Sequence, residues 1–242
     1  MANYNESREF IPNVELPEIS KDLLRKTITS VEFKNKLIEA INLYNKNNRE
    51  YGFAIIKNPQ NDDVWFGDVV AGQARNETDL SKSANPVNKK LQSLNIDGHN
   101  FIDFHIHPYD YGEVIAPSID YGQYSGDLYD NNKDRIYIDP INFDHYIIPS
   151  ISLIATPTKK QINILAFRQP LKHNPLDLTE SMAEMEDIIE YAQTQEEIIT
   201  AMKQIGYLVT MMQTDLDYNF DEESISKFEQ LAYKPIQTPR DY

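Results

Sequence analysis

The stretch at residues 101–107, Phe-Ile-Asp-Phe-His-Ile-His, constrains the fold most strongly, because apolar and polar residues alternate along it. Alternation with a period of two is typical of a β-strand, in which side chains two residues apart lie on the same face. Pro108 ends the stretch. We therefore expect a strand that presents both His105 and His107 on one side of a sheet.

Other segments complete an α/β pattern. Short apolar runs between turn residues predict four further strands, at 53–56, 64–70, 147–155 and 162–167. A capping-box pair, Thr29 and Glu32, predicts the start of a helix that continues to about Tyr44. Helical segments are also expected near Leu91 and Leu128. Strands between helices indicate an α/β fold with a mixed β-sheet flanked by helices.

The two ends of the chain have a different character. Residues 1–28 are polar and contain Pro12 and Pro17, so we expect an N-terminal extended arm. Residues 29–172 form the predicted main domain. Apolar residues recur at helical spacing in three runs, at 182–192, 198–212 and 225–231, the first after a second capping-box pair, Asp177 and Glu180. Residues 173–242 are therefore predicted to be a helical C-terminal extension.

Composition excludes several classes of protein. The net charge of −15 argues against a nucleic-acid partner, because binding a phosphate backbone needs a concentrated basic face. No apolar run approaches the roughly 18 residues of a membrane span, and the first residues lack the pattern of a secretory signal, so we expect a cytoplasmic protein with no membrane partner. The absence of cysteine leaves only His and carboxylate side chains as strong ligands for a metal.

The histidine pair is a candidate metal centre. Two imidazoles on one side of a strand can converge on a zinc ion at about 2.0–2.1 Å each. A catalytic zinc needs a third protein ligand and an open position for water. Acidic residues are frequent after Pro108 and supply candidates for the third ligand: Asp110, Glu113, Asp120, Asp127 and Asp130. The pair alone does not distinguish a metal centre from two histidines on a solvated strand edge.

The run His105-Ile106-His107-Pro108 resembles the JAMM metalloprotease motif of the JAB/MPN domain family. In that family a Glu on an early strand precedes the His-x-His-Pro element, and Glu50, 55 residues before His105 (105 − 50), matches it. The order of helix, Glu, Gly, apolar strand, second strand and histidine strand is also the family's order. The resemblance implies a cytidine-deaminase-like architecture for 29–172, one zinc ion per chain, and Glu50 as the catalytic base.

The family's Ser-x-x-Asp element is altered in this chain. It appears twice with one residue fewer, as Ser118 before Asp120 and as Ser125 before Asp127. We favour Asp127 over Asp120 as the third zinc ligand, because Ser125-Gly126-Asp127-Leu128 is more similar to the family's pattern. The resemblance then implies that Ser125 or Ser118 donates a hydrogen bond to the oxyanion of the transition state.

The implied function is a zinc-dependent metallopeptidase that hydrolyses a peptide or isopeptide bond in a protein or peptide substrate. A ubiquitin-like C-terminus is the substrate that the resemblance suggests, which would make the chain a deubiquitinase-like isopeptidase. Two alternatives stay open: a non-catalytic MPN-like module that binds or scaffolds, and a peptidase that acts on cell-wall-type peptides. The C-terminal helices are a candidate surface for a partner or for a homo-oligomer.

Overall fold

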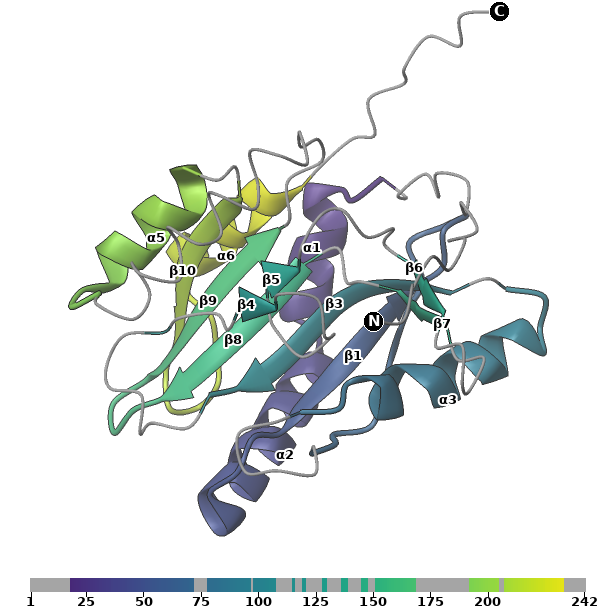
Figure 1. Cartoon of the computed structure of the whole chain (residues 1–242), viewed down its shortest axis with the longest axis horizontal. Coiled ribbons are helices and arrows are strands. Elements are labelled where there is room, and N and C mark those ends of the chain that lie inside the picture. The colour runs from purple at the N-terminus through teal and green to yellow at the C-terminus, as the bar shows by residue number, and fades with distance from the viewer. Residues whose placement is uncertain are drawn as a thin grey trace, which may run out of the picture.

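The computed structural model describes residues 18–71, 78–96, 98–107, 115, 119–120, 128–129, 136–138, 145–147, 151–168, 192–204 and 207–232. For residue 99 and for the four short segments between 119 and 147 it describes the backbone alone. Figure 1 shows a large twisted sheet with helices on both faces. No helix in these ranges is long and apolar enough to cross a membrane.

The main sheet has six strands in the order β10-β9-β8-β3-β1-β2 (Figure 1). Their bounds are β1 Gly52–Lys57, β2 Val64–Phe66, β3 His99–Ile106, β8 Ile151–Pro157, β9 Ile162–Arg168 and β10 Leu208–Thr214. β3 and β8 run parallel, and the other neighbouring pairs are antiparallel. The prediction of an α/β fold with a mixed sheet flanked by helices is thus confirmed.

Two small sheets accompany the main one. β4 (Ile119–Asp120) pairs in parallel with β5 (Leu128–Tyr129), and β6 (Ile136–Ile138) pairs antiparallel with β7 (His145–Ile147). The helical piece expected around Leu128 is therefore wrong, because Leu128 belongs to a strand.

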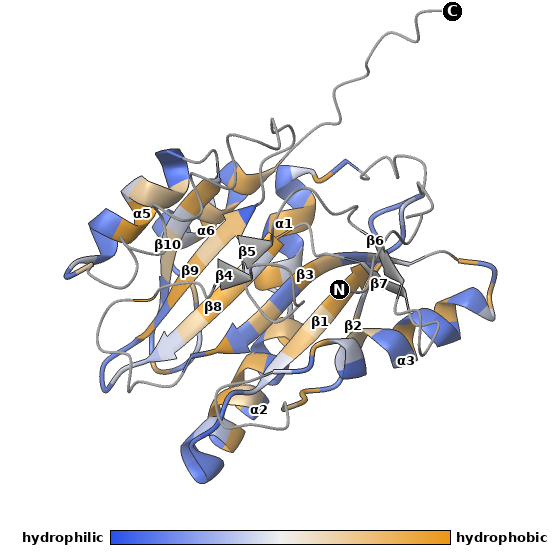
Figure 2. Cartoon of the chain, in the orientation of Figure 1, coloured by the Kyte–Doolittle hydropathy of each residue, from blue (hydrophilic) through white to orange (hydrophobic). Residues whose placement is uncertain are grey.

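Helices cover the main sheet on both faces. One face packs against α1 (Lys21–Ile28), α2 (Val31–Asn47), α6 (Glu222–Phe228) and the short helix η2 (Glu229–Leu231) in one large core cluster. The other face packs against α3 (Ser81–Gln92) near β1 and against α5 (Gln195–Gln204) near β8 and β9. Figure 2 shows that β1, β8 and β9 are largely hydrophobic, that hydrophobic and hydrophilic bands alternate along β3, and that α3 carries a long hydrophilic stretch. Buried strands between two helical layers explain the nearly continuous apolar runs of β1, β8 and β9.

The N-terminal region differs from the sequence prediction, because residues 21–28 of the expected extended arm form α1. Ser20 caps this helix by accepting a hydrogen bond from the Leu23 amide, and Leu23, Leu24 and Ile28 are buried. The cap of α2 is also shifted by one residue from the predicted Thr29. Thr29 closes α1, so Ser30 is the residue that accepts from the Phe33 amide and starts α2.

The C-terminal region is helical only in part. The predicted helix over 198–212 is two elements, α5 followed by β10, and β10 extends the main sheet next to β9. The run at 225–231 is helical as expected, in α6 and η2. The second capping box at Asp177 and Glu180 and most of the run at 182–192 lie outside the described residues.

Candidate metal centre

Strand β3 carries both histidines toward the face of the sheet that α3 and α5 cover. Phe104 and Ile106 point into the opposite core, where they pack with α2. Since side chains alternate along a strand, His105 and the adjoining His107 point the other way. β3 lies between β1 and β8 in the interior of the sheet. The predicted strand therefore exists, and it places the two imidazoles on one face.

The two imidazole rings converge. Their Nε2 atoms are 3.0 Å apart, and the ring centroids are 4.9 Å apart with an interplanar angle of 52°. His105 is 6% exposed and His107 is half-buried. Two nitrogens at about 2.0–2.1 Å from one tetrahedral zinc would be about 3.4 Å apart. At 3.0 Å the pair can share a proton or, with a small opening, direct both lone pairs at one cation.

The end of β3 is held firmly on both sides. The Ile106 amide donates to the Tyr51 carbonyl (3.0 Å), and the His107 amide donates to the Ala155 carbonyl (2.9 Å). Beneath the histidines, on the opposite face, the rings of Phe53 and Phe104 stack with centroids 4.9 Å apart. Because a packed core allows little backbone movement, these contacts hold in place the backbone that carries the two imidazoles.

Gly52 lies directly opposite His105 in the antiparallel β1–β3 pair. A Cβ atom at this position would be 2.3 Å from the Phe104 carbonyl oxygen and 2.8 Å from the His105 Cβ. Both distances are too short for any side chain, so glycine is required for β1 to approach β3 this closely. In the sequence, Gly52 counts only as one member of the motif order. Its role in the close approach of the two strands depends on the strand register, which the sequence does not give.

Glu50 lies two residues before Gly52, at the entrance to β1. The pairing continues past Gly52, since the Ile106 amide bonds to the Tyr51 carbonyl, and one further step in this register places Glu50 opposite His107. Directly opposed residues have Cβ atoms about 4.5–5.5 Å apart on the same face. The Glu50 side chain is 6% exposed, and its Oε2 accepts a hydrogen bond from Thr78 Oγ1 (3.3 Å). Glu50 is thus a buried acidic residue, and the extrapolated register would bring it next to His107.

Asp103 is a second buried carboxylate on this face, and sequence reasoning did not single it out. It precedes His105 by two residues, pairs with Ala54 on β1 and Ser152 on β8, and is 3% exposed. Asp103 and His105 lie two residues apart on β3, so their side chains leave the strand on the same side. The strand alternation could have indicated its position, since Asp103, His105 and His107 are spaced by two.

The predicted third ligand is not placed by this structure. Asp127, Ser125 and Ser118 lie outside the described residues, and Asp120 is described only as backbone in β4. Within the described ranges no group of three or more His, Asp or Glu side chains is arranged to hold a metal ion. A complete three-ligand centre therefore needs a ligand whose side chain is not among those described.

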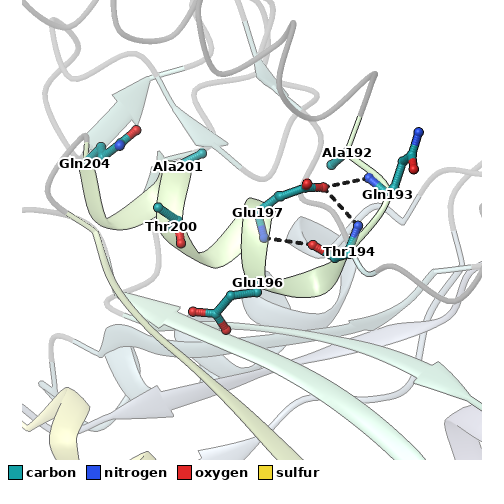
Figure 3. Close-up of a pocket in the computed structure, with 8 residues that line it drawn as sticks. All are labelled: Ala192, Gln193, Thr194, Glu196, Glu197, Thr200, Ala201 and Gln204. Carbon is teal, nitrogen blue, oxygen red and sulfur yellow. Dashed lines mark hydrogen bonds between the residues drawn. The ribbon is translucent and has the colours of Figure 1, made fainter.

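A separate surface hollow of about 760 Å³ lies along α5 (Figure 3). Six of the eight residues that line it are of polar type: the lining consists of Ala192, Gln193, Thr194, Glu196, Glu197, Thr200, Ala201 and Gln204. Glu197 accepts hydrogen bonds from the Gln193 and Thr194 amides at 2.8 and 3.1 Å, and these bonds lower its pKa. The carboxylate therefore caps its own helix, and none of the candidate ligands lines this hollow.

Comparison of the chain with protein-family models, with curated proteins and with solved structures finds no match. Its function must therefore be argued from its own residues.

Proposed function

We propose that this chain is a zinc-dependent metallopeptidase of the JAMM type, with a JAB/MPN-like domain around strand β3. The observation that carries the proposal is the convergence of the His105 and His107 Nε2 atoms, 3.0 Å apart, at the end of β3 that pairs with Gly52, two residues after the buried Glu50. The sequence supports the same motif, since Glu50, Gly52 and the His-x-His-Pro run follow the family's order.

The residues present fit a zinc ion. Two neutral imidazoles are standard zinc ligands, and a carboxylate completes a common three-ligand set with an open position. We propose Asp127 as that carboxylate, ahead of Asp120. When bound, the zinc ion would supply a Lewis acid for the scissile carbonyl and for the attacking water.

The protein's own groups would then manage protons and orientation. Glu50, buried at the entrance to β1, would take a proton from the attacking water and return it to the leaving amine. Ser125 or Ser118 would donate a hydrogen bond to the oxyanion. The substrate is a peptide or isopeptide bond, and an extended ubiquitin-like C-terminal tail would fit beside a strand of this sheet.

The first test is the metal content of the purified wild type and of His107→Ala, Asp127→Ala and Asp120→Ala, by elemental analysis. We expect about one zinc per chain in the wild type, lost in His107→Ala and in only one of the aspartate variants. A wild type that binds no zinc even after resupply would contradict the proposal and favour a non-catalytic binding module.

The second test separates binding from chemistry. Glu50→Gln should keep its zinc and lose about 10²–10⁴-fold in the rate of cleavage of a ubiquitin-like C-terminal substrate. Glu39→Gln is a matched control, because Glu39 is 51% exposed on α2. Full turnover by Glu50→Gln would rule out Glu50 as the base.

A further inference from the structure

The beginning of α3 lies against the candidate centre. Leu80, the residue that precedes the helix, packs over Gly52: its Cδ2 would be 2.9 Å from a Cβ at that position. Gly52 is in turn opposite His105. The segment from Thr78 to Leu80 therefore covers the end of β1 on the face that carries the histidines.

This segment is fastened to the sheet through Ser83. The Ser83 hydroxyl accepts a hydrogen bond from the Ala54 amide of β1 (3.0 Å) and donates one to the Asp68 carbonyl (2.7 Å). Gly67 packs so closely that a Cβ there would be 2.2 Å from Ser83 Oγ. The Ser83 side chain, in the first turn of α3, thus accepts a hydrogen bond from β1 that a neighbouring strand would otherwise accept. Its close contact with Gly67 sets the distance between the helix and the sheet.

Asp79 shapes the turn between Thr78 and the helix. Its carboxylate accepts from Ser81 Oγ (2.5 Å) and pairs with Lys82 Nζ (3.0 Å). Burial raises the pKa of Asp79, but the hydrogen bonds from Ser81 and Lys82 outweigh it and leave the pKa below its usual value. The charged, hydrogen-bonded carboxylate holds this turn in one conformation.

This arrangement of the turn places Thr78 next to Glu50. Its hydroxyl donates to Glu50 Oε2 at 3.3 Å, and the carboxylate it contacts is 6% exposed. A donor fixed on one carboxylate oxygen limits rotation of the carboxylate plane, and such supporting bonds orient catalytic groups in many enzymes.

We propose that Thr78 is a positioning residue that orients the Glu50 carboxylate toward the histidine pair. This inference rests on the proposed function, in which Glu50 is the base. This role belongs to the hydroxyl group of Thr78. Thr78→Val removes the hydroxyl group with little change in the shape of the side chain, whereas Thr78→Ser keeps the hydroxyl group.

The kinetic test compares these two variants with the wild type on the same ubiquitin-like C-terminal substrate. Thr78→Val should lower kcat about 10- to 100-fold, change KM by less than about twofold and keep its zinc, while Thr78→Ser should recover kcat to within about threefold. Thr27→Val is the control, because Thr27 is a buried threonine of α1, on the other face of the sheet, and its hydroxyl bonds to the Leu23 carbonyl. A wild-type kcat in Thr78→Val, or a loss that serine fails to recover, would overturn the inference.

A thermal double-mutant cycle tests the contact without any activity. The Tm loss of Thr78→Val/Glu50→Ala should be smaller than the sum of the two single losses by about 3 °C or more, because both single variants remove the same bond. Additive losses would show that the bond is not made and overturn the inference. A wild type that binds no zinc and hydrolyses no substrate would overturn both the proposed function and the role of Thr78. An active wild type together with an equally active Thr78→Val variant would overturn the role of Thr78 alone.

Discussion

The strand contact at Gly52 determines how closely Glu50 and His105 can approach. A Cβ atom there would collide with the Phe104 carbonyl oxygen, a backbone atom that cannot turn away (2.3 Å). We expect Gly52→Ala to lower the free energy of unfolding by about 3 kcal/mol and to weaken zinc binding, because β1 must separate from β3. Urea unfolding and elemental analysis measure the two effects.

Gly98→Ala is the control for this prediction. A Cβ at Gly98 would also be crowded, at 2.6 Å from Asn88 Oδ1 and from Ile56 Cγ2, but these are side-chain atoms near the opposite end of β3. Gly98→Ala should lower the free energy of unfolding by about 1 kcal/mol and leave the zinc content unchanged. If Gly52→Ala behaved in the same way as Gly98→Ala, the close contact between the strands would not matter for the centre.

The sequence pattern indicates the residues of the candidate site that carry recognisable chemistry. His105 and His107 follow from spacing along one strand, and Glu50 follows from its place in a motif. Asp103 shares the same spacing of two but was not singled out, and Thr78 does not follow from the sequence, because its proximity to Glu50 depends on where α3 begins. The third ligand stays a prediction.

At the scale of elements, β10 shows why the pattern of a buried strand can be mistaken for that of a helix. Val209 and Met212 are apolar and three residues apart, a spacing that favours a helix. Both side chains are buried in the structure. In the sheet they point to opposite faces: Val209 packs with α5 and Met212 with the cluster that includes Phe228 of α6. A strand covered on both faces loses its alternation, so periodicity alone could not identify it.

Helix α5 also anchors the chain that follows the histidines. The Ile115 amide donates to Gln195 Oε1 (2.7 Å), Gln195 Nε2 donates to the Ile115 carbonyl (2.9 Å), and the Ile115 side chain is 1% exposed in the cluster around Ile154 and Leu165. Gln195→Ala should therefore reduce the free energy of unfolding by about 1–3 kcal/mol, since both backbone groups lose their partner.

Gln193→Ala provides the comparison, because Gln193 is exposed just before the same helix. It should change the free energy of unfolding in urea by less than about 0.5 kcal/mol. Equal stability of the two variants would mean that the two-point contact with Ile115 contributes nothing to the fold.

At the scale of the whole molecule, charge is the dominant feature. A net charge of −15 produces self-repulsion, which added salt screens. Against this, several carboxylates have lowered pKa values because backbone amides donate to them: Gln193 to Glu197, Asn219 to Asp215, and Ser224 to Asp221. Each of these bonds closes a turn or caps a helix, so the folded state favours the ionised form of these groups.

Acid should therefore destabilise the protein once repulsion is screened. A carboxyl group whose pKa is lower in the folded state stabilises the fold above its unfolded pKa, about 3.9 for Asp, and loses that contribution as the pH falls through the folded pKa. In about 0.5 M NaCl we expect the contribution of Asp221 to Tm to be constant from pH 7 to about pH 5 and to decline as the pH falls below about 4. Asp221→Asn keeps the α6 cap without a titrating group, so its Tm should fall less than that of the wild type between pH 5 and pH 3. Parallel curves for the two proteins would show that the charge of Asp221 does not contribute to acid stability.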